Sequence, residues 1–494
     1  MSTVTTPHYR RRRFGPVGLG LAVLGVGGAA IAALLIWRGM RSPLPELPPP
    51  LPQHGTIQAY FNHAESFRYT HPYRERLRQG QLRQDQLRPG NNLEQIIVEA
   101  IASAQVSVDM AVQEINLPNI AAALAERQRA GVQVRVIVEN QYRQPWSRRT
   151  AAQIGGLTPR DRHKYSEFLR LADADGNGTA SPAEQQQHDA LARLEAASIS
   201  ILDDTADGSK GSGLMHHKFL VIDGQTVVTG SANFTVSGLH GDLDSAASLG
   251  NANHLLAIAS KDLARLFTQE FELMWGDGPG GQPNSRFGLQ KPYRPAQTLW
   301  IEDAQVEVQF SPTSPTQPWD ESVNGLVGRW LTQASQSIDL ALFVFSDQRL
   351  SAALQTPHRQ GIPIRALIDS GFAYRPYSEG LDMLGVSLVN AQCRYDDGNA
   401  PWLPSLPTVG VPTLPEGDVL HHKFAVLDGQ RVITGSQNWS EAANTRNDEV
   451  LLAIAHPTVA AHFQQEFDRL YARSSIGVPG WLTKKIDQER SRCR

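Results

Sequence analysis

The chain of 494 residues is poor in cysteine and lacks the short motifs of several enzyme classes. Its two cysteines, Cys393 and Cys493, are too few for a disulfide framework or a cysteine-based zinc site. Because Cys493 is the penultimate residue, we expect two unpaired thiols, with a bond between them as the alternative. The sequence contains no Walker phosphate loop, no dinucleotide-binding glycine motif and no His-Glu-x-x-His zinc motif.

Outside the amino terminus, acidic residues outnumber basic ones. The first 42 residues contain six arginines and no acidic residue. Without these six, 40 basic residues stand against 49 acidic ones, so the remainder has a net charge near −9. Non-specific binding of nucleic acid depends on cationic surface, so this balance weighs against a nucleic-acid partner, although a local cationic groove is compatible with an acidic protein.

An uncharged apolar run occupies residues 14–37, directly after Arg10–Arg13. Its length is enough to cross a bilayer, and the preceding arginines predict a cytoplasmic amino terminus. We therefore expect residues 1–42 to be a single-pass membrane anchor with an extracytoplasmic body. The alternative is a cleaved signal peptide and a secreted or periplasmic protein. Residues 43–55 are rich in proline and predict a stiff spacer.

The rest of the chain contains an internal repeat. The segment Ser107–Ala111 recurs as Ser337–Ala341, and Gly131–Arg135 recurs as Gly361–Arg365, both 230 positions later. Around these segments, apolar strands alternate with helical periodicity, which predicts an α/β fold of sheets covered by helices.

The repeat sets the expected domain boundaries. We expect a first repeat over residues 56–276, a Gly/Pro-rich linker over 277–298, a second repeat over 299–474 and a peripheral polar tail over 475–494.

One motif occurs once in each repeat. His216-His217-Lys218 leads through an apolar strand to Asp223-Gly224 and then to Gly230-Ser231-Ala232-Asn233. The second copy runs from His421-His422-Lys423 through Asp428-Gly429 to Gly435-Ser436-Gln437-Asn438. Each Asp-Gly pair predicts a hairpin. Alternate residues of a strand share a face, so each copy places an imidazole beside an ammonium, a pair suited to a phosphate.

This pattern, His-x-Lys-x4-Asp followed by Gly-Ser-x-Asn, resembles the phospholipase D superfamily. The resemblance implies two repeats, each a mixed β-sheet flanked by helices, packed about a pseudo-twofold axis with one shared active site. It also implies phosphodiester cleavage through a covalent phosphohistidine, without a metal cofactor.

The resemblance assigns roles residue by residue. By analogy His216 is the nucleophile and His421 the general acid and then base, although the symmetric motif leaves the reverse order open. Asp223 and Asp428 open the turns and orient the motif. Glu449 matches a position where an acid orients a catalytic histidine, and the first repeat has Asn253 there. The predicted catalytic set is His216, Lys218, Asp223, His421, Lys423, Asp428 and Glu449, and the predicted phosphate-binding set is Ser231, Asn233, Ser436 and Asn438.

The first repeat contains extra residues that resemble an EF-hand calcium loop. The insert spans about 158–196, with flanking helices expected over Arg160–Leu171 and Pro182–Ala196. The spacing of oxygen-bearing residues predicts a structural calcium site, with a solvated turn as the alternative. The predicted calcium ligands are Asp173, Asp175, Asn177, Thr179, Ser181 and Glu184.

These observations predict a monomeric, membrane-anchored phosphodiesterase that hydrolyses or transfers the phosphatidyl group of phospholipids. One alternative is an endonuclease that uses the same chemistry on DNA or RNA. Another is a non-catalytic, calcium-binding surface module, which two intact motifs argue against.

Overall fold

The structure is a computed structural model that describes residues 46–76, 87–209, 213–243, 245–389, 392–395 and 398–493. The chain divides into two compact units, Met1–Pro48 and Pro49–Arg494. The predicted membrane anchor, residues 1–42, lies outside the described residues. Within the described ranges, no helix combines the length and the apolar character needed to cross a membrane.

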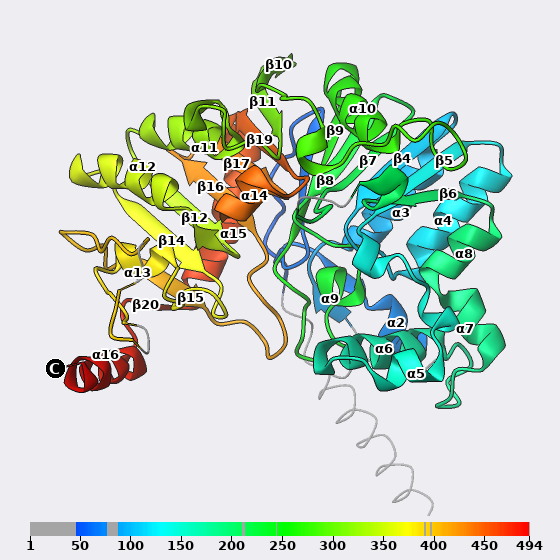
Figure 1. Cartoon of the computed structure of the whole chain (residues 1–494), viewed down its shortest axis with the longest axis horizontal. Coiled ribbons are helices and arrows are strands. Elements are labelled where there is room, and N and C mark those ends of the chain that lie inside the picture. Colours follow the sequence, from blue (N-terminus) through cyan, green and yellow to red (C-terminus); the bar gives the residue numbers. More distant parts are fainter. Residues whose placement is uncertain are drawn as a thin grey trace, which may run out of the picture. The chain divides into compact units, whose positions relative to one another are not determined.

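The first repeat is built on a seven-stranded sheet with the order β1-β9-β8-β7-β4-β5-β6 (Figure 1). Strands β4, β5 and β6 are parallel, and the other neighbours are antiparallel. The sheet is therefore mixed, as predicted. The strands are β1 Ile57–Phe61, β4 Ser107–Val112, β5 Gln133–Val138, β6 Ser200–Asp203, β7 Lys218–Ile222, β8 Thr226–Gly230 and β9 His254–Ala259.

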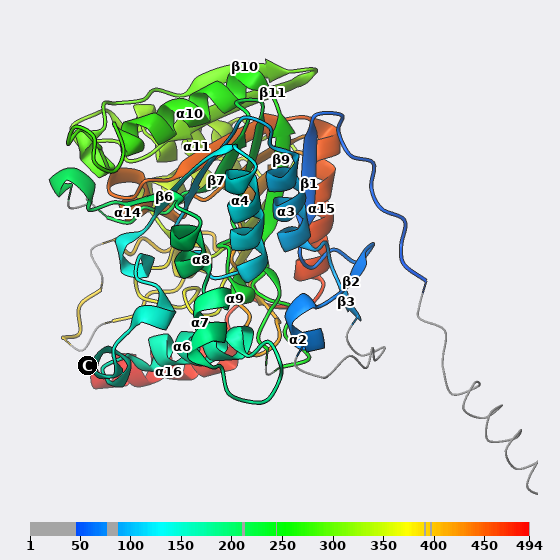
Figure 2. The ribbon, with the colours of Figure 1, turned by 90° about the vertical axis from the view of Figure 1, so that its right-hand side faces the viewer.

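Helices cover both faces of this sheet. One face packs against helices that share a core with Leu220 and Val108, and Figure 2 shows α3 and α4 lying over it. The other face, which includes Phe219 and Val221, packs against α10. The helices are α3 Leu93–Ser103, α4 Pro118–Arg129, α8 Ala190–Ala196, α9 Val236–Leu239 and α10 Lys261–Trp275. A short helix α2 and a two-stranded sheet of β2 and β3 precede them, at Pro72–Arg76, Arg68–Thr70 and Leu87–Pro89.

The second repeat has the same sheet with one strand added at each edge. Its order is β10-β11-β19-β17-β16-β12-β14-β15-β20, in which the seven inner strands follow the order of the first sheet. The predicted internal repeat is thereby confirmed. The strands are β10 Gln297–Ile301, β11 Ala304–Phe310, β12 Ile338–Leu342, β14 Ile364–Ile368, β15 Val409–Pro412, β16 Lys423–Leu427, β17 Arg431–Gly435, β19 Val450–Ala455 and β20 Ser474–Ile476.

The helices of the second repeat follow the same plan. Helices α11, α12 and α13 share a core with one face of the sheet, and α15 packs on the other face. Their bounds are α11 Val323–Thr332, α12 Gln348–Arg359, α13 Glu379–Met383, α14 Glu441–Thr445 and α15 Pro457–Tyr471. Two short strands, β13 Phe345–Ser346 and β18 Trp439–Ser440, pair with each other beside α14.

A single apolar core joins the two repeats. It contains Phe219 and Phe267 from the first repeat together with Phe310, Phe424 and Phe463 from the second. The rings of Phe267 and Phe310 are 5.2 Å apart, an edge contact that crosses the boundary between the repeats. The repeats are therefore packed into one body, as the resemblance implied.

The predicted linker belongs to this body as well. Within residues 277–298, Phe287 is buried, and the buried ammonium of Lys291 contacts Glu270 of the first repeat and Asp448 of the second. The segment therefore ties the repeats together by packing as well as by chain continuity.

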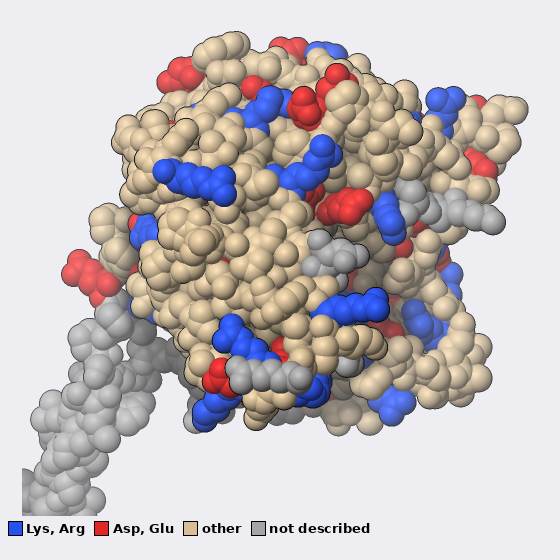
Figure 3. All heavy atoms as spheres, turned by 60° about the vertical axis from the view of Figure 1, so that its left-hand side comes forward, with Lys and Arg blue, Asp and Glu red and all other residues tan. Residues whose placement is uncertain are grey.

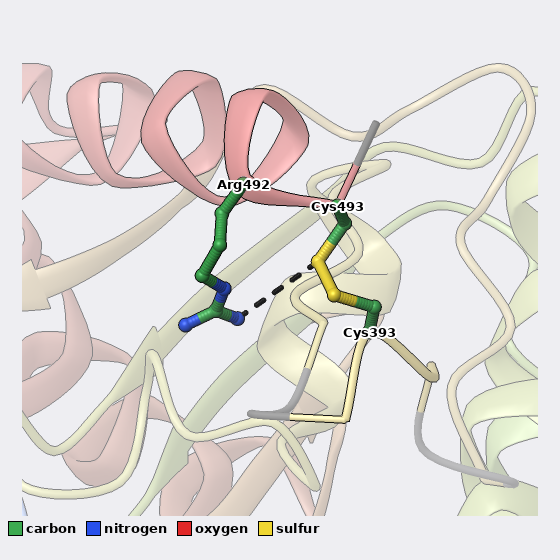
Figure 4. The surroundings of a disulfide bond; sticks show 3 residues. All are labelled: Cys393, Arg492 and Cys493. Atoms are coloured by element: carbon green, nitrogen blue, oxygen red, sulfur yellow. Dashed lines mark hydrogen bonds between the residues drawn. A yellow bond between two sulfur atoms is a disulfide. The ribbon is translucent and has the colours of Figure 1, made fainter.

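The carboxyl-terminal tail lies at the surface and is attached to the second repeat. Helix α16, Gly480–Arg492, buries Leu482 against Leu381 and Leu388 of the second repeat. Figure 4 shows the disulfide bond between Cys493, at the end of this helix, and Cys393. The expectation of unpaired thiols was wrong because α16 packs back on the domain and returns the penultimate residue to a loop 100 positions earlier.

The insert of the first repeat lies between β5 and β6. It consists of α5 Ala151–Gly155, α6 Pro159–Ala172 and α7 Pro182–His188, which lie below the first sheet in Figure 1. The single helix expected over 182–196 is two helices, because Asp189 ends α7 and its carboxylate caps α8 by accepting from the N–H groups of Leu191 and Ala192.

Candidate functional site

A cavity of about 730 Å³ contains the first histidine of both motifs. His216 and Asn233 line it from the first repeat, and His421 and Asn438 line it from the second. Two imidazoles about two hundred positions apart in the chain therefore share one cavity, as the repeated motif predicts.

Reciprocal backbone contacts place the two motifs. Short parallel bridges join Met215 to Asp448 and Ala252 to Leu420. The N–H of His216 donates to the carbonyl of Asp448 over 2.9 Å, and the N–H of His421 donates to the carbonyl of Ala252 over 3.1 Å. The first motif is thus held by the segment that precedes β19, and the second motif by the segment that precedes β9. This reciprocal arrangement is the one expected of a pseudo-twofold pair.

Each imidazole is oriented by a side chain of the opposite repeat. His216 Nδ1 lies 2.6 Å from Oε2 of Glu449, and His421 Nδ1 lies 2.9 Å from Oδ1 of Asn253. Asn447 in turn donates to Oε1 of Glu449 over 3.0 Å. Fixing Nδ1 in this way leaves Nε2 of both rings as the nitrogen available for chemistry.

The two motif lysines are fully buried beside these rings. Lys218 Nζ donates to the carbonyl of His216 over 2.7 Å, and Lys423 Nζ donates to the carbonyl of His421 over 2.6 Å. Burial lowers the pKa of Lys218 to about 7. Burial also lowers the pKa of Lys423, and the nearby charge of Lys218 lowers it further. A bound anion would favour the charged form of both ammonium groups.

Desolvation also shifts the pKa values of the two motif histidines and of Glu449. Burial lowers the pKa of His216 and of His421, and the lysine charges act in the same direction. Both rings are therefore neutral near pH 7, a state in which Nε2 can act as a nucleophile. Burial raises the pKa of Glu449 to about 7, so this carboxyl group titrates within the physiological range.

The asparagines and serines of the motifs have different surroundings. Asn233 and Asn438 line the cavity, and Oδ1 of each is buried without a hydrogen-bond partner among the described residues. An amide in this position can present its N–H groups to a phosphoryl oxygen. Ser231 instead donates to Oδ1 of Asn253, and Ser436 accepts from the N–H of Val450. The serines therefore support the site rather than face the cavity.

The motif aspartates lie at the far ends of their strands. The carboxylate of Asp223 accepts the N–H groups of Gln105, Val106 and Ser107, and Asp428 makes the equivalent contacts with residues 335–337. Both aspartates have positive φ angles, 52° and 57°, within their turns. Neither lines the cavity. Grouping them with the catalytic residues is therefore corrected, because they fix the hairpins that carry the motifs.

The second histidine of each doublet faces the opposite side of the sheet. His217 Nε2 lies 3.4 Å from Glu270, and His422 Nε2 lies 3.0 Å from Glu466, in fully buried pairs. Both residues are therefore buried in the core and do not line the cavity.

The sequence did not point to the walls of the cavity. One wall is α6 of the insert, which contributes Arg160, His163, Lys164 and Glu167 at helical spacing. Lys164 pairs with Glu114 over 2.6 Å. The second repeat contributes Phe343, Gly417 and Val419 to the lining. The i, i+3, i+4, i+7 pattern of polar residues on α6 was the available signal.

The predicted calcium loop has a compact arrangement of oxygen atoms. Carboxylate oxygens of Asp173, Asp175 and Glu184 lie within 4.8 Å of one another. The loop turns because Asp173 accepts the N–H groups of Asn177 and Gly178. Ser181 caps α7, and the hydroxyl of Thr179 donates to Asn177. This oxygen-rich donor set suits a hard cation such as calcium.

Comparison with known proteins identifies a family that matches this chain. The family described as "Cardiolipin synthase, PLD-like domain" matches residues 97–275 and 328–471. The mitochondrial cardiolipin hydrolase of Xenopus laevis is 31% identical over 143 residues, which cover 28% of this chain and 57% of that protein. A phospholipase D of Rickettsia typhi is 25% identical over 146 residues, covering 30% of this chain and 61% of that protein. The chain thus spans about half the length of the curated relatives it matches.

One solved structure resembles the whole body. The phosphatidylserine synthase of Haemophilus influenzae is 11% identical, with a TM-score of 0.50, and the match covers 90% of this chain and 95% of that one. At this identity the likeness concerns the fold alone.

Proposed function

The chain belongs to the family of PLD-like domains described as cardiolipin synthase, and on that premise we propose that it is a phospholipid phosphodiesterase of the phospholipase D type. One observation carries this proposal: His216 and His421 line one cavity, and each ring is oriented by a residue of the opposite repeat. Relatives named cardiolipin hydrolase and phospholipase D support a phospholipid as the substrate.

The first chemical step transfers the phosphatidyl group to the protein. Nε2 of His216 attacks phosphorus, and the phosphorus–oxygen bond to the head group breaks. The negative charge of the bound phosphodiester favours protonation of His421, which then donates its Nε2 proton to the leaving oxygen. The second step reverses these roles. Nε2 of His421 removes a proton from water or from an acceptor alcohol, the resulting oxygen attacks phosphorus, and the phosphorus–nitrogen bond to His216 breaks.

The other motif residues neutralise the phosphate. Lys218 and Lys423 supply positive charge beside the two rings, and the amides of Asn233 and Asn438 supply hydrogen bonds to the phosphoryl oxygens. Glu449 holds the Nδ1 proton of His216 and stabilises the charge that develops on that ring. These groups provide a nucleophile, an acid, a base and charge neutralisation without a metal ion.

Phospholipid and nucleic acid are separated by offering both substrates in parallel. Mixed phospholipid vesicles and labelled DNA are incubated with the wild type, His216→Ala and His421→Ala. We expect head-group release by the wild type, a loss of at least about 10³-fold in each variant, and intact DNA. DNA cleavage without head-group release would instead establish the endonuclease alternative, and inertness toward both would favour the non-catalytic module.

The choice of phospholipid over nucleic acid rests on charge. The body is acidic overall, and on the face shown in Figure 3 the lysine and arginine side chains are scattered among uncharged and acidic ones rather than gathered into one patch. A nucleic-acid site needs a continuous cationic track for the phosphate backbone.

The order of the two histidines is tested by trapping the intermediate. Rapid alkaline quenching during turnover, followed by proteolysis and mass spectrometry, locates the phosphatidyl group on the peptide with His216 or on the peptide with His421. We expect the adduct on His216, because Glu449 gives this ring the stronger acceptor at Nδ1. An adduct on His421 would reverse the assigned roles.

We also propose that the body is extracytoplasmic and tethered by residues 1–42. The disulfide between Cys393 and Cys493 supports this location, because such bonds persist in oxidising compartments. The intact mass of the protein from the membrane fraction is the test. A mass that includes residues 1–42 fits an uncleaved anchor, and a mass that lacks them in a soluble fraction fits a cleaved signal.

The insert loop is proposed to hold one structural calcium ion, with Asp173, Asp175 and Glu184 as its carboxylate ligands. Removing the ion leaves these carboxylates to repel one another, so a chelator is expected to lower the melting temperature and to leave kcat almost unchanged. Glu184→Gln should abolish the effect of the chelator. Loss of turnover on chelation, in protein shown to remain folded, would contradict the metal-free chemistry.

A further inference from the structure

A second cavity, of about 350 Å³, lies in the second repeat and shares no lining residue with the catalytic cavity. Its walls come from the segment after β11, from the starts of α12 and α13, and from α14. The reaction derived above uses none of these residues, so a ligand of this cavity would be distinct from the phospholipid substrate.

Four residues of these walls each bury a polar atom that has no hydrogen-bond partner within the described ranges. The atoms are Oγ1 of Thr313, Nε1 of Trp319, Oε1 of Gln348 and Oε2 of Glu379. Thr313 and Glu379 are only 3% and 4% exposed, so bulk solvent does not reach them freely. Buried polar groups without partners are rare in folded proteins because each costs free energy. A ligand that pairs with several of them would recover that cost.

The unpaired atoms differ in kind. Trp319 Nε1 is a donor and Gln348 Oε1 is an acceptor as placed. The Thr313 hydroxyl and the protonated carboxyl group of Glu379 can each donate or accept. A hydroxyl group both donates and accepts, so a ligand with several hydroxyls can satisfy this mixture. A pure donor such as an ammonium group, or a pure acceptor such as a phosphate, would leave part of it unpaired.

The charges around the cavity also favour a neutral ligand. Arg349 stacks over the ring of Trp319 at 5.1 Å and disfavours a cation, whereas Asp347 and Glu441 disfavour an anion. Burial, together with the nearby charge of Asp382, raises the pKa of Glu379 to about 9, so this carboxyl group is neutral near pH 7. A neutral ligand meets no unbalanced charge here.

The polar walls are a property of the second repeat and not of the shared fold. At the 230-residue spacing of the repeat, Asp347 and Gln348 correspond to Leu117 and Pro118 of the first repeat. Asp347 also accepts from Nδ2 of Asn324 over 2.6 Å, which places its carboxylate in a buried polar network. The common architecture therefore does not require polar residues at these positions.

We propose that this cavity binds a small neutral polyhydroxylated molecule, a polyol or a monosaccharide. Its volume falls in the range of small-molecule sites, and Trp319 and Tyr377 add aromatic surface to the polar groups. This site is separate from the phosphodiesterase centre, and the proposal does not depend on that activity.

The test is calorimetric titration of the full-length protein with glycerol, myo-inositol and glucose, in a detergent without a sugar head group. We expect at least one of these probes to bind with a stoichiometry of one. Thr313→Val and Trp319→Phe each remove one of the unpaired groups and are expected to weaken binding about 5- to 30-fold. Thr298→Val and Trp300→Phe on the exposed strand β10 are the matched controls, and they should leave binding unchanged.

Thermal unfolding checks that every variant is folded before titration. Binding that Thr313→Val and Trp319→Phe weaken, and that the β10 controls preserve, supports the proposal. The proposal is overturned if none of the three polyols binds, if all four variants behave alike, or if ethanolamine or inorganic phosphate binds in their place and responds to Thr313→Val.

Discussion

Glu449 and Asn253 occupy equivalent positions but give the two imidazoles different chemistry. A carboxylate beside Nδ1 stabilises the imidazolium, whereas an amide oxygen only holds the ring in place. The ring of His216 can therefore carry the positive charge of a phosphohistidine, and the ring of His421 gives up its proton more readily. This asymmetry, built on a symmetric motif, is the physical basis for assigning His216 as nucleophile.

The pH dependence of kcat/KM should follow two groups of the free protein. Lys218, with its pKa lowered to about 7, is charged below that pH and neutral above it, so activity falls on the alkaline side. Glu449, with its pKa raised to about 7, loses its charge as the pH falls, so activity also declines on the acid side. Because the groups are close, the two limbs report the coupled site. We expect a bell-shaped profile with its maximum near pH 7, measured between about pH 5 and pH 9.

Glu449→Gln separates the two limbs. The variant keeps an acceptor for Nδ1 of His216 but has no titrating carboxyl, so kcat should fall about 100-fold and the acid limb should disappear. The alkaline limb should remain. Asn253→Gln is the matched change in the other repeat and should leave both limbs in place. An acid limb that persists in Glu449→Gln would show that another group controls it.

At the scale of elements, α6 supplies a row of polar side chains to the cavity lining. Its polar residues line the cavity together with the apolar Phe343 and Val419 of the second repeat, so the polar head group is expected on the α6 side. Arg160 is exposed on this part of the lining, and removing it takes away one favourable contact with an anionic phospholipid. We expect Arg160→Ala to raise KM for phosphatidylglycerol about fivefold with little change in kcat, an effect that shrinks at high salt.

Arg162 provides the control for this prediction. It lies two residues further along α6, is exposed and does not line the cavity. Steady-state kinetics of Arg162→Ala should match the wild type. Equal changes in KM for the two variants would mean that general surface charge, and not the cavity wall, governs the effect.

The disulfide joins α16 to the long loop before the second motif. Breaking it frees the chain at Cys493 and at Cys393. Beyond Cys393 the chain passes through β15 before it reaches Gly417 and Val419 in the cavity lining. Cys393→Ser is expected to lower the free energy of unfolding by about 2–4 kcal/mol. Denaturant unfolding with and without reductant measures this change. The double variant with Cys493→Ser should be no less stable than either single one, and a reductant without effect on the wild type would contradict the prediction.

Local patterns in the sequence were enough for most of the fold. Strand and helix periodicity, repeated 230 residues apart, predicted the two sheets and the hairpins that begin at Asp223 and Asp428. Contacts across the repeats were beyond such patterns, because the partner of each imidazole depends on how the two halves pack. For the same reason the sequence did not reveal the bond of Cys493 or the position of α6 in the cavity wall.

At the scale of the whole molecule, the site exists only when both repeats are assembled. Each motif lacks its orienting side chain unless the other repeat supplies it, and one core of aromatic side chains crosses the boundary. A repeat on its own would expose this core to water and would contain an incomplete cavity. The packing between the repeats, and not the chain that connects them, should therefore hold the site together.

Cutting the exposed linker tests this claim directly. A protease site placed between Gly280 and Gly281 lies before the buried anchor residues Phe287 and Lys291, which stay with the second repeat and contact the first. After cleavage the two fragments should co-elute in size-exclusion chromatography and keep activity within about twofold, because obligate interfaces of this apolar kind do not need a covalent tether. Fragments expressed separately should be inactive, since neither has both imidazoles with their orienting partners. If cleavage released the fragments with loss of activity, the linker would be the element that maintains the shared site.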